Sequence, residues 1–164
     1  MNLSRSKPAL IEIASDDIAE IRIDPTKNHR SLFSRREFSA NEIISDFGSR
    51  RTYSKPSYLT IQISDSKHIE LLPDYLECIN HSCDPNCFFD TAKRQLISLK
   101  HIMEGEELTF FYPSTEWDMD RAFQCNCGND NCIGLIQGAK YLPEPIVKNY
   151  QFTRFIEQKL ASKH

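Results

Sequence analysis

The chain has 164 residues, with 20 lysines and arginines against 23 aspartates and glutamates, which gives a formal net charge of −3 at pH 7. This length fits one domain with a single core and is short for two. The slightly acidic balance, without a long basic run, argues against direct nucleic-acid binding. No apolar stretch approaches the roughly 18 residues that span a membrane, so we expect an intracellular, soluble protein of the nucleus or cytoplasm.

Short apolar alternations dominate the first two thirds of the chain and predict many short strands. We expect these strands over residues 10–13, 18–23, 58–63, 87–89, 95–100 and 107–112. The polar turn at residues 90–94 predicts a hairpin, and Pro113 should stop the last strand. From about Ile146, after two prolines, the spacing of apolar residues becomes helical. The sequence therefore predicts a mostly β fold with a C-terminal helix packed on it.

Four of the six cysteines form a candidate metal site. Cys125, Cys127 and Cys132 make a C-x-C-x4-C stretch, and Cys83 lies far upstream in the segment NHSCDPN. A closed structural zinc site takes four tetrahedral ligands, so the compact trio needs a fourth, and Cys83 is the best candidate. In a reducing compartment, metal binding is expected before disulfides. Cys78 and Cys87 are left as packing residues, and a turn with free cysteines is the alternative for the C-x-C-x4-C stretch.

Two residues outside this cluster are candidates for chemistry. His81 stands in the NHSCDPN segment, and Tyr112 ends an apolar strand before a proline. Taken alone, His81 is more typical of a hydrogen-bonded structural residue, and Tyr112 of a buried tyrosine with a satisfied hydroxyl. The neighbouring motifs decide between these interpretations and a functional one.

The order of NHSCDPN, then residues 105–112, then C-x-C-x4-C resembles the SET-domain protein-lysine methyltransferases with a post-SET zinc segment. Ser57-Tyr58-Leu59 and residues 40–44 also resemble short motifs of that family. The resemblance implies a SET-domain fold of several small sheets with a pseudoknot and a zinc-clamped post-SET segment. It divides the chain into a SET domain at 9–114, a post-SET segment at 115–138 and a C-terminal helical extension at 139–164.

The resemblance also implies a function: transfer of a methyl group from S-adenosylmethionine to a lysine of a histone or other protein. Tyr112 would be catalytic, because its hydroxyl would orient the amine and the methyl group. The implied cofactor contacts are His29, Arg30, Ser31, Leu32, Tyr58, Asn80, His81 and Asn126. Phe110, Asp46 and Trp117 would belong to the substrate channel; Phe110 would decide how many methyl groups fit, and Trp117 is either a lid or a core anchor.

The chain departs from the family pattern at three places. His29-Arg30-Ser31 stands where the family carries Gly-x-Gly, so the flexible glycines beside the cofactor are missing. The segment around Asp46 lacks an expected tyrosine, and Glu77 replaces an arginine. These departures keep two alternatives open: a catalytically weak or inactive SET-like peptide-binding module, and a small zinc-stabilised interaction domain.

Overall fold

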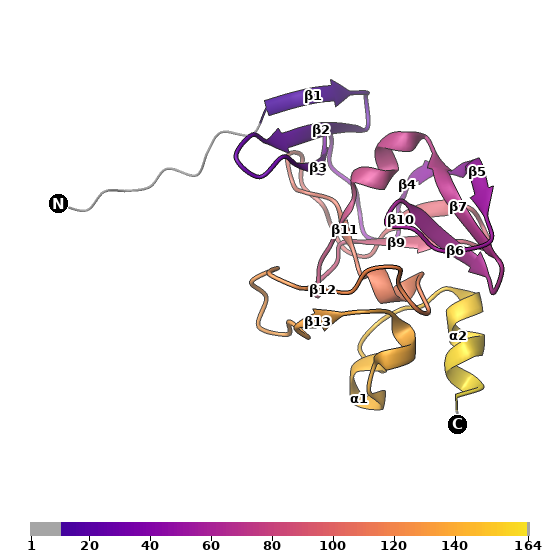
Figure 1. The fold of residues 1–164 in the computed structure, drawn as a ribbon. Helices are drawn as coiled ribbons and strands as arrows, with labels where there is room; N and C mark the ends of the chain where they lie inside the picture. Colours follow the sequence, from indigo (N-terminus) through magenta and orange to yellow (C-terminus); the bar gives the residue numbers. More distant parts are fainter. Residues whose placement is uncertain (1–10, 164) are drawn as a thin grey trace.

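Four small β-sheets make up the body of the protein in the computed structural model, which describes residues 11–163 (Figure 1). This confirms the predicted mostly β fold. The expected domain start at residue 9, and the first residue of the strand expected over 10–13, lie outside the described residues. None of the helices in the described part of the chain has the length and apolarity needed to cross a membrane.

Two of the sheets have three strands each, and one has two. The first contains antiparallel strands in the order β1 (Ile11–Ser15), β2 (Ala19–Asp24) and β3 (His29–Ser34). The second has the order β5 (Gly48–Tyr53), β7 (Lys67–Leu72) and β6 (Thr60–Ser64). The two-stranded sheet pairs β12 (Phe123–Gln124) with β13 (Leu135–Ile136).

The central sheet has five strands and contains the chain crossing. Its order is β4 (Ile43–Asp46), β10 (Gln95–Ser98), β9 (Cys87–Asp90), β11 (Thr109–Phe110) and β8 (Asn80–His81). The antiparallel pairing of β9 with β10 confirms the predicted hairpin. Strand β11 lies parallel to both β8 and β9 and is inserted between them. The chain therefore passes between the two ends of the NHSCDPN segment, which is the expected pseudoknot.

Asn86 fixes this crossing with its side chain. Its Oδ1 accepts a hydrogen bond from the backbone N–H of Thr109 at 2.8 Å, and its Nδ2 donates to the carbonyl of Glu107 at 2.8 Å. Asn86 itself is buried. Both ends of one side-chain amide thus satisfy backbone groups that a two-residue strand leaves without ladder partners.

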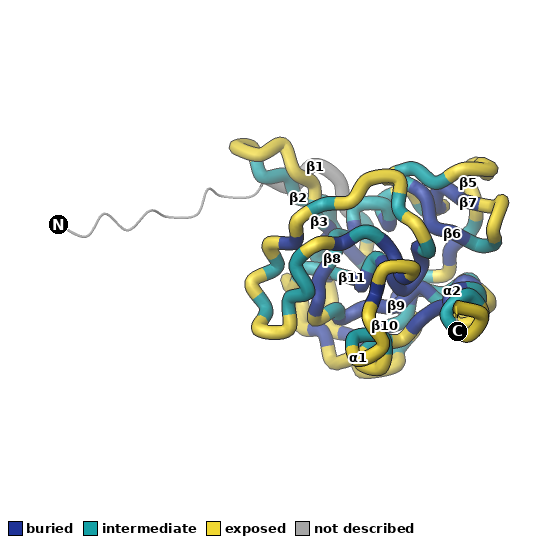
Figure 2. Tube along the Cα trace, turned by 60° about the horizontal axis from the view of Figure 1, so that its bottom comes forward, coloured by how far each residue is buried: buried dark blue, intermediate teal, exposed yellow. Residues whose placement is uncertain are grey.

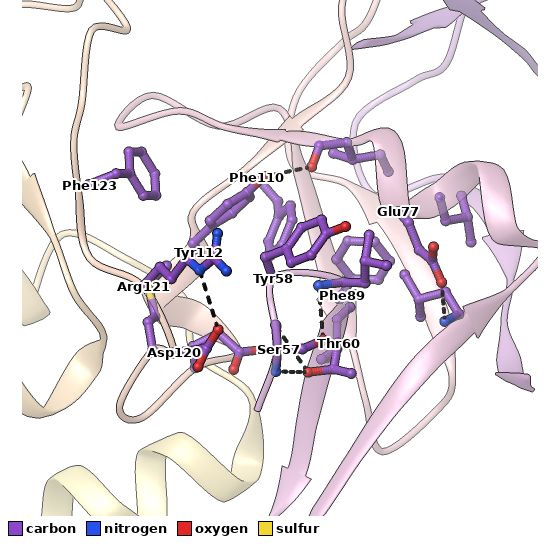
Figure 3. A pocket seen from close by; sticks show the side chains of 17 residues that line it. Ser57, Tyr58, Thr60, Glu77, Phe89, Phe110, Tyr112, Asp120, Arg121 and Phe123 are labelled. Atoms are coloured by element: carbon purple, nitrogen blue, oxygen red, sulfur yellow. Dashed lines mark hydrogen bonds and ion pairs between the residues drawn. The ribbon is translucent and has the colours of Figure 1, made fainter. Parts of the chain in front are cut away.

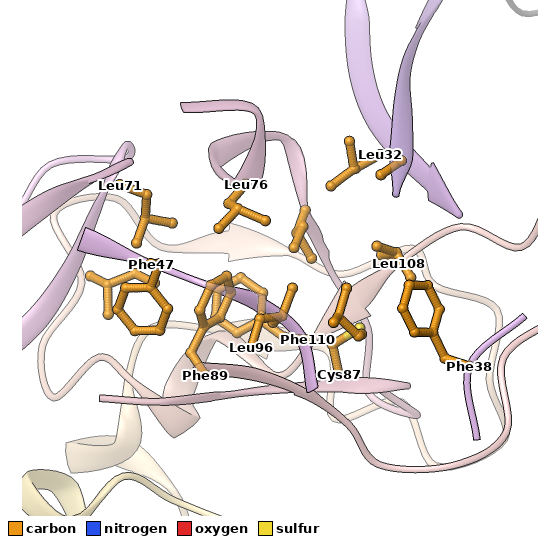
Figure 4. Packing of buried hydrophobic residues seen from close by; sticks show 14 of the residues in the cluster. Leu32, Phe38, Phe47, Leu71, Leu76, Cys87, Phe89, Leu96, Leu108 and Phe110 are labelled. Carbon is orange, nitrogen blue, oxygen red and sulfur yellow. The ribbon is translucent and has the colours of Figure 1, made fainter. Parts of the chain in front are cut away.

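The main core lies between the central sheet and the segments around it (Figure 4). Its members include fully buried Leu32, Phe38, Phe89 and Leu96. Cys87 is also part of this core, which confirms its expected packing role. Strand β9 lies in the buried centre of the molecule, and the turn between β2 and β3 is exposed (Figure 2).

The prediction that the last strand of the body reaches Tyr112 is wrong at its C-terminal end. Strand β11 ends at Phe110, and a 3-10 helix, η2 (Tyr112–Ser114), follows. Pro113 sits in the first turn, where its missing N–H costs nothing, and the turn closes with Thr115 N–H on the carbonyl of Tyr112 at 3.1 Å. Two other 3-10 helices are η1 (Asp74–Cys78) and η3 (Ala139–Tyr141).

The C-terminal part contains the predicted helix and a shorter helix before it. They are α1 (Glu144–Val147), which lies below β13 in Figure 1, and α2 (Arg154–Ala161), which contacts η3. Thr153 begins α2 as its N-cap, because its Oγ1 accepts a hydrogen bond from Ile156 N–H at 3.4 Å. A second core forms here around Phe111 and Phe152 and joins this part of the chain to η2.

Candidate active site and metal centre

An apolar pocket with a volume of ≈ 180 Å³ lies beside β11 (Figure 3). Its wall comes from four segments far apart in the sequence. The wall includes Tyr58, Glu77, Phe89, Phe110, Tyr112, Glu116, Met119, Asp120, Arg121 and Phe123. The pocket therefore collects Tyr58, Phe110 and Tyr112, three of the residues predicted for the site.

Tyr112 places its hydroxyl in this pocket. The O–H donates a hydrogen bond to the carbonyl of Ile79 at 3.2 Å, as the dashed line in Figure 3 marks. Burial raises the pKa of the phenol above its usual range, so Tyr112 stays neutral at physiological pH. A neutral phenol with one donated bond keeps its oxygen lone pairs for a group that enters the pocket.

Phe110 lines the pocket next to Tyr112, with the two ring centroids 4.7 Å apart. Its other neighbour is Phe89, which it meets edge to face at 4.8 Å. Only 8% of Phe110 is exposed. The ring therefore has a fixed orientation, and it presents no polar atom to the pocket.

His81 is held inside the protein by both ring nitrogens. Nδ1 accepts a hydrogen bond from the backbone N–H of Tyr112 at 3.2 Å, so the ring proton resides on Nε2, which lies 3.3 Å from Sγ of Cys83. Burial lowers the pKa of His81 to about 4. The side chain is thus a neutral bridge between Tyr112 and the cysteine cluster, and any cofactor contact of His81 would have to come from its backbone.

Asn80 connects β8 to the predicted cofactor segment on β3. Its Nδ2 donates to the carbonyl of Arg30 at 3.0 Å and to Oγ of Ser31 at 2.9 Å, and Oε1 of Glu107 accepts at 3.1 Å. No described residue hydrogen-bonds to Oδ1 of Asn80. The structure thus brings Asn80, Arg30 and Ser31 together, with Oδ1 free to accept.

The remaining residues predicted for cofactor binding differ in exposure. His29 and Arg30 are exposed at the start of β3, and 75% of Tyr58 is exposed. Leu32 is fully buried in the main core, so only its backbone could take part. Asn126 is exposed between two cysteines of the cluster and does not line the pocket.

Two residues predicted for the substrate channel are not in the pocket wall. Asp46 is exposed at the end of β4, where it accepts a hydrogen bond from Gln95 Nε2 at 3.3 Å. Trp117 packs on the C-terminal core, under the ammonium of Lys159 at 5.3 Å from the ring centroid. Because Trp117 packs on that core and does not line the pocket, the structure favours its role as a core anchor.

The four predicted cysteines meet in space. The sulfur atoms of Cys83, Cys125, Cys127 and Cys132 all lie within 4.8 Å of one another. Zinc–sulfur bonds of about 2.3 Å place the sulfurs of a tetrahedron about 3.8 Å apart, and those of Cys83 and Cys125 are 3.9 Å apart. The cluster therefore fits one zinc ion in a closed four-sulfur site. Such a site is structural, because it leaves no open position for substrate or water.

Backbone N–H groups and the C-terminal extension support this cluster. Cys127 N–H points at Sγ of Cys125 at 3.4 Å, and Ile133 N–H points at Sγ of Cys83 at 3.5 Å. The carbonyl of Cys83 accepts a hydrogen bond from Tyr150 O–H at 2.7 Å. The ring of Tyr150 in turn stacks on Phe111, with centroids 3.7 Å apart. The cluster, the β body and the extension are thus connected through Cys83.

Several wall residues were not among the sequence candidates. Glu116, Met119, Asp120, Arg121 and Phe123 all come from the stretch between η2 and the cysteine trio. Arg121 places its guanidinium 6.0 Å from the centroid of Tyr58, which marks the exposed mouth of the pocket. The only local indication in the sequence was the position of this stretch directly after Tyr112.

Comparison with known protein families matches residues 29–113 to the SET domain. Among curated proteins, the methyltransferase flvH of Aspergillus flavus is 40% identical over 111 residues, which cover 66% of this chain and 62% of that protein. A histone-lysine N-methyltransferase of Mycosarcoma maydis, H3 lysine-36 specific, is 38% identical over 37% of this chain and 7% of its own length. One of Aspergillus oryzae, H3 lysine-4 specific, is 43% identical over 35% of this chain and 5% of its own length.

The fold comparison agrees with the sequence comparison. The crystal structure of KRYPTONITE in complex with mCHH DNA, H3(1-15) peptide and SAH superposes with a TM-score of 0.54 and 20% identity, over 71% of this chain and 29% of that one. The chain therefore spans less than two thirds of each of these proteins. Because the family match covers more than half of the chain and the described fold agrees with it, the chain belongs to the SET-domain family.

Proposed function

We propose that this protein is an S-adenosylmethionine-dependent protein-lysine N-methyltransferase. The observation that carries the proposal is the Tyr112 hydroxyl, held in a narrow apolar pocket beside Phe110 by a hydrogen bond to the Ile79 carbonyl. The methyltransferase relatives support the reaction class. The substrate is a protein or peptide that carries a lysine, in the nucleus or cytoplasm. The absence of direct nucleic-acid binding stays a prediction.

The pocket suits methyl transfer to an amine. A free lysine side chain has a pKa of about 10.4, and the reacting amine must be neutral. The mostly apolar wall disfavours the ammonium, and the neutral Tyr112 hydroxyl can accept a hydrogen bond from the amine and orient its lone pair. Tyr112 needs no charge for this role. Phe89 and Phe110 exclude water from the same space. The amine, and not water, is therefore the group that is aligned with the transferred methyl group.

The residues near β3 and β8 fit a zwitterionic cofactor. The guanidinium of Arg30 is exposed and suits a carboxylate, and Asn80 Oδ1 can accept from an ammonium. Tyr58 offers an exposed aromatic face at the pocket mouth. When bound there, S-adenosylmethionine would supply an electrophilic methyl group on a sulfonium. His29, Ser31, His81 and Asn126 would contact it through backbone or exposed polar atoms, and Leu32 through backbone alone.

The cysteine cluster would bind one structural zinc ion and make residues 115–138 a post-SET segment. The zinc would hold the stretch from Glu116 to Phe123 against the pocket, because Cys125 follows that stretch by two residues. In this division residues 9–114 form the SET domain and residues 139–164 form an extension that braces Cys83 through Tyr150. The metal would thus shape the pocket wall without touching the substrate.

Two measurements test the proposal. Calorimetric titration with S-adenosylmethionine should give saturable binding, and the labelled cofactor should transfer methyl groups to lysines of proteins in a cell extract. Tyr112→Phe should lose the transfer and retain binding. The absence of both binding and transfer in a zinc-loaded sample would contradict the proposal.

A SET-like module that binds peptides without catalysis is the second candidate. The observation that favours it is the regular pairing of β3, where His29 and Arg30 stand opposite Asp24 and Ile23 in the first sheet. A regular strand without glycine curls less easily around a cofactor. Peptide binding without cofactor binding would support this second function.

A further inference from the structure

Glu116 is a buried acid in the wall of the pocket. Only 7% of the residue is exposed. Its backbone N–H donates to the carbonyl of Tyr112 at 3.2 Å, which places it one turn after that residue. Both side chains line the same pocket. Tyr112 and Glu116 therefore both contribute to the wall of this pocket.

One carboxyl oxygen of Glu116 is fixed and the other has no donor. Oε1 accepts from the backbone N–H of Gln62 at 3.0 Å and from Oγ1 of Thr115 at 3.2 Å. Gln62 also binds the next residue, since its Oε1 accepts from Trp117 N–H at 2.9 Å. No described residue donates a hydrogen bond to Oε2. The side chain is thus held in one orientation with one oxygen available.

An ionised Glu116 would have no charged partner among residues 11–163. No described lysine, arginine or histidine lies within ion-pair distance of it. Glu77, another acid of the pocket, is paired with Arg50 at 3.2 Å. The one cationic wall residue, Arg121, lies beside Asp120 at 3.8 Å. The remaining titratable wall residues are the phenols of Tyr58 and Tyr112, which carry no positive charge.

A buried carboxylate without a partner is costly, and a cation that enters the pocket removes that cost. Burial raises the pKa of Glu116 to about 8, against the lowering effect of the hydrogen bonds from Gln62 and Thr115. The wall is otherwise mostly apolar and suits a linear alkyl chain, so an ammonium at the end of such a chain finds its compensating charge only at Glu116.

We propose that Glu116 is the substrate-recognition residue that binds the primary alkylammonium group of the incoming side chain inside the pocket. The proposal names the cation-binding group of the proposed methyltransferase and rests on that function for the identity of the amine as lysine. After capture, a proton can pass from nitrogen to the carboxylate oxygen, because burial has brought the two groups closer in proton affinity. The products are a neutral carboxylic acid and a neutral amine.

The test uses n-butylammonium as a probe of the lysine side chain and n-butanol as its neutral counterpart, with the full zinc-loaded chain and no cofactor. Binding is followed by NMR titration at pH 9 and pH 6. At pH 9 the wild type should bind butylammonium about tenfold more tightly than butanol. At pH 6, where the carboxyl is protonated, this preference should shrink.

Glu116→Gln should bind both probes equally at either pH, because glutamine keeps the acceptor for Gln62 N–H and loses the charge. Glu104→Gln, a change at an exposed position outside the pocket, should retain the wild-type preference. Retention of the preference in Glu116→Gln, or its loss in Asp120→Asn instead, would overturn the proposal. Methyl transfer by the wild type with an unchanged KM for lysine peptide in Glu116→Gln would also overturn it. A charge-dependent preference without any methyl transfer would refute the proposed function and leave the role of Glu116 in place.

Discussion

The backbone N–H of Tyr112 donates a hydrogen bond to Nδ1 of His81 across 3.2 Å. The second ring nitrogen of His81 lies 3.3 Å from Sγ of Cys83. One imidazole therefore connects the start of η2, which carries the Tyr112 hydroxyl, to the metal cluster. The local geometry of the pocket depends on this bridge.

Replacing His81 with phenylalanine should destabilise the protein. The aromatic contacts to Phe111, Tyr112 and Phe123 would be largely kept, but Tyr112 N–H would lose its acceptor. A buried donor without a partner costs about 1–3 kcal/mol. Urea unfolding of the zinc-loaded protein measures this cost, and His101→Gln, at an exposed position, serves as the control. Equal stabilities of the two variants would show that the bridge contributes nothing.

Removal of the metal should loosen the C-terminal third of the chain. We expect one zinc per chain in the wild type and in Cys78→Ser, whose sulfur lies outside the cluster, and none bound tightly in Cys132→Ser. Chelation should raise hydrogen exchange in residues 123–137 first, because their few backbone bonds depend on the cluster. A metal analysis that finds no zinc in the wild type would contradict this prediction.

The sequence predicted those parts of the site that depend on short motifs. NHSCDPN and the cysteine trio have fixed spacings that ligand chemistry explains, so the cluster and the Asn80, His81 and Tyr112 group could be expected. The strand β5 could not, because its polar sequence Gly-Ser-Arg-Arg-Thr-Tyr lies at an exposed sheet edge and has no apolar alternation. Asp46 was assigned to the channel by position in a motif, yet β4 directs it to the surface.

The pocket wall after Tyr112 shows a further limit. The carboxyl group of Glu116 is oriented by a hydrogen bond from Gln62 in β6, which is 54 residues away in the sequence. No local pattern encodes that contact. The prediction that the strand ends at Tyr112 was wrong for a related reason. The composition of residues 107–112, rich in aromatic and apolar side chains, suits a strand, but Pro113 and the bond of Tyr112 N–H to His81 accompany a turn into η2. Tertiary contacts outweighed local propensity at both positions.

Tyr112→Phe should remove most methyl transfer and leave cofactor binding within a few fold. The hydroxyl acts on the reacting amine, and its bond to the Ile79 carbonyl contributes only about 1 kcal/mol to stability. We expect kcat to fall at least about tenfold. Tyr141→Phe, which removes an exposed hydroxyl bound to Asp118, is the matched control. Near-normal turnover of Tyr112→Phe would make Tyr112 a core tyrosine only.

Glu116 should make the stability of the protein depend on pH. Burial raises its pKa from the ordinary value of about 4.5 to about 8 in the folded state, so the folded protein binds the proton more tightly than the unfolded chain. The resulting stabilisation is complete below about pH 4.5 and is lost as the pH rises toward 8. Each unit corresponds to about 1.4 kcal/mol. The difference in unfolding free energy between Glu116→Gln and the wild type should therefore shift in favour of the mutant across this range. A difference that stays constant from pH 4.5 to 8 would contradict the raised pKa.

Phe110 should set the number of methyl groups that the pocket accepts. Phe110 lies 4.7 Å from the Tyr112 ring and has no polar atom, so it cannot hold a water where a second methyl group must go. We expect the wild type to proceed beyond monomethyl-lysine. Phe110→Tyr should accumulate the monomethyl product, because its hydroxyl can bind such a water. One hydrogen bond of about 1 kcal/mol corresponds to a several-fold change in the ratio of successive steps.

Mass spectrometry of a lysine peptide, sampled at low conversion, measures this ratio. Phe33→Tyr adds the same hydroxyl outside the pocket, under the guanidinium of Arg22, and should leave the product distribution unchanged. If the wild type stops at one methyl group, the space beside Phe110 is limited by another wall residue, and Phe89, which fixes the Phe110 ring edge to face, is the next to test. If the distribution of Phe110→Tyr equals that of the wild type, no water bound to a hydroxyl at this position controls the second transfer.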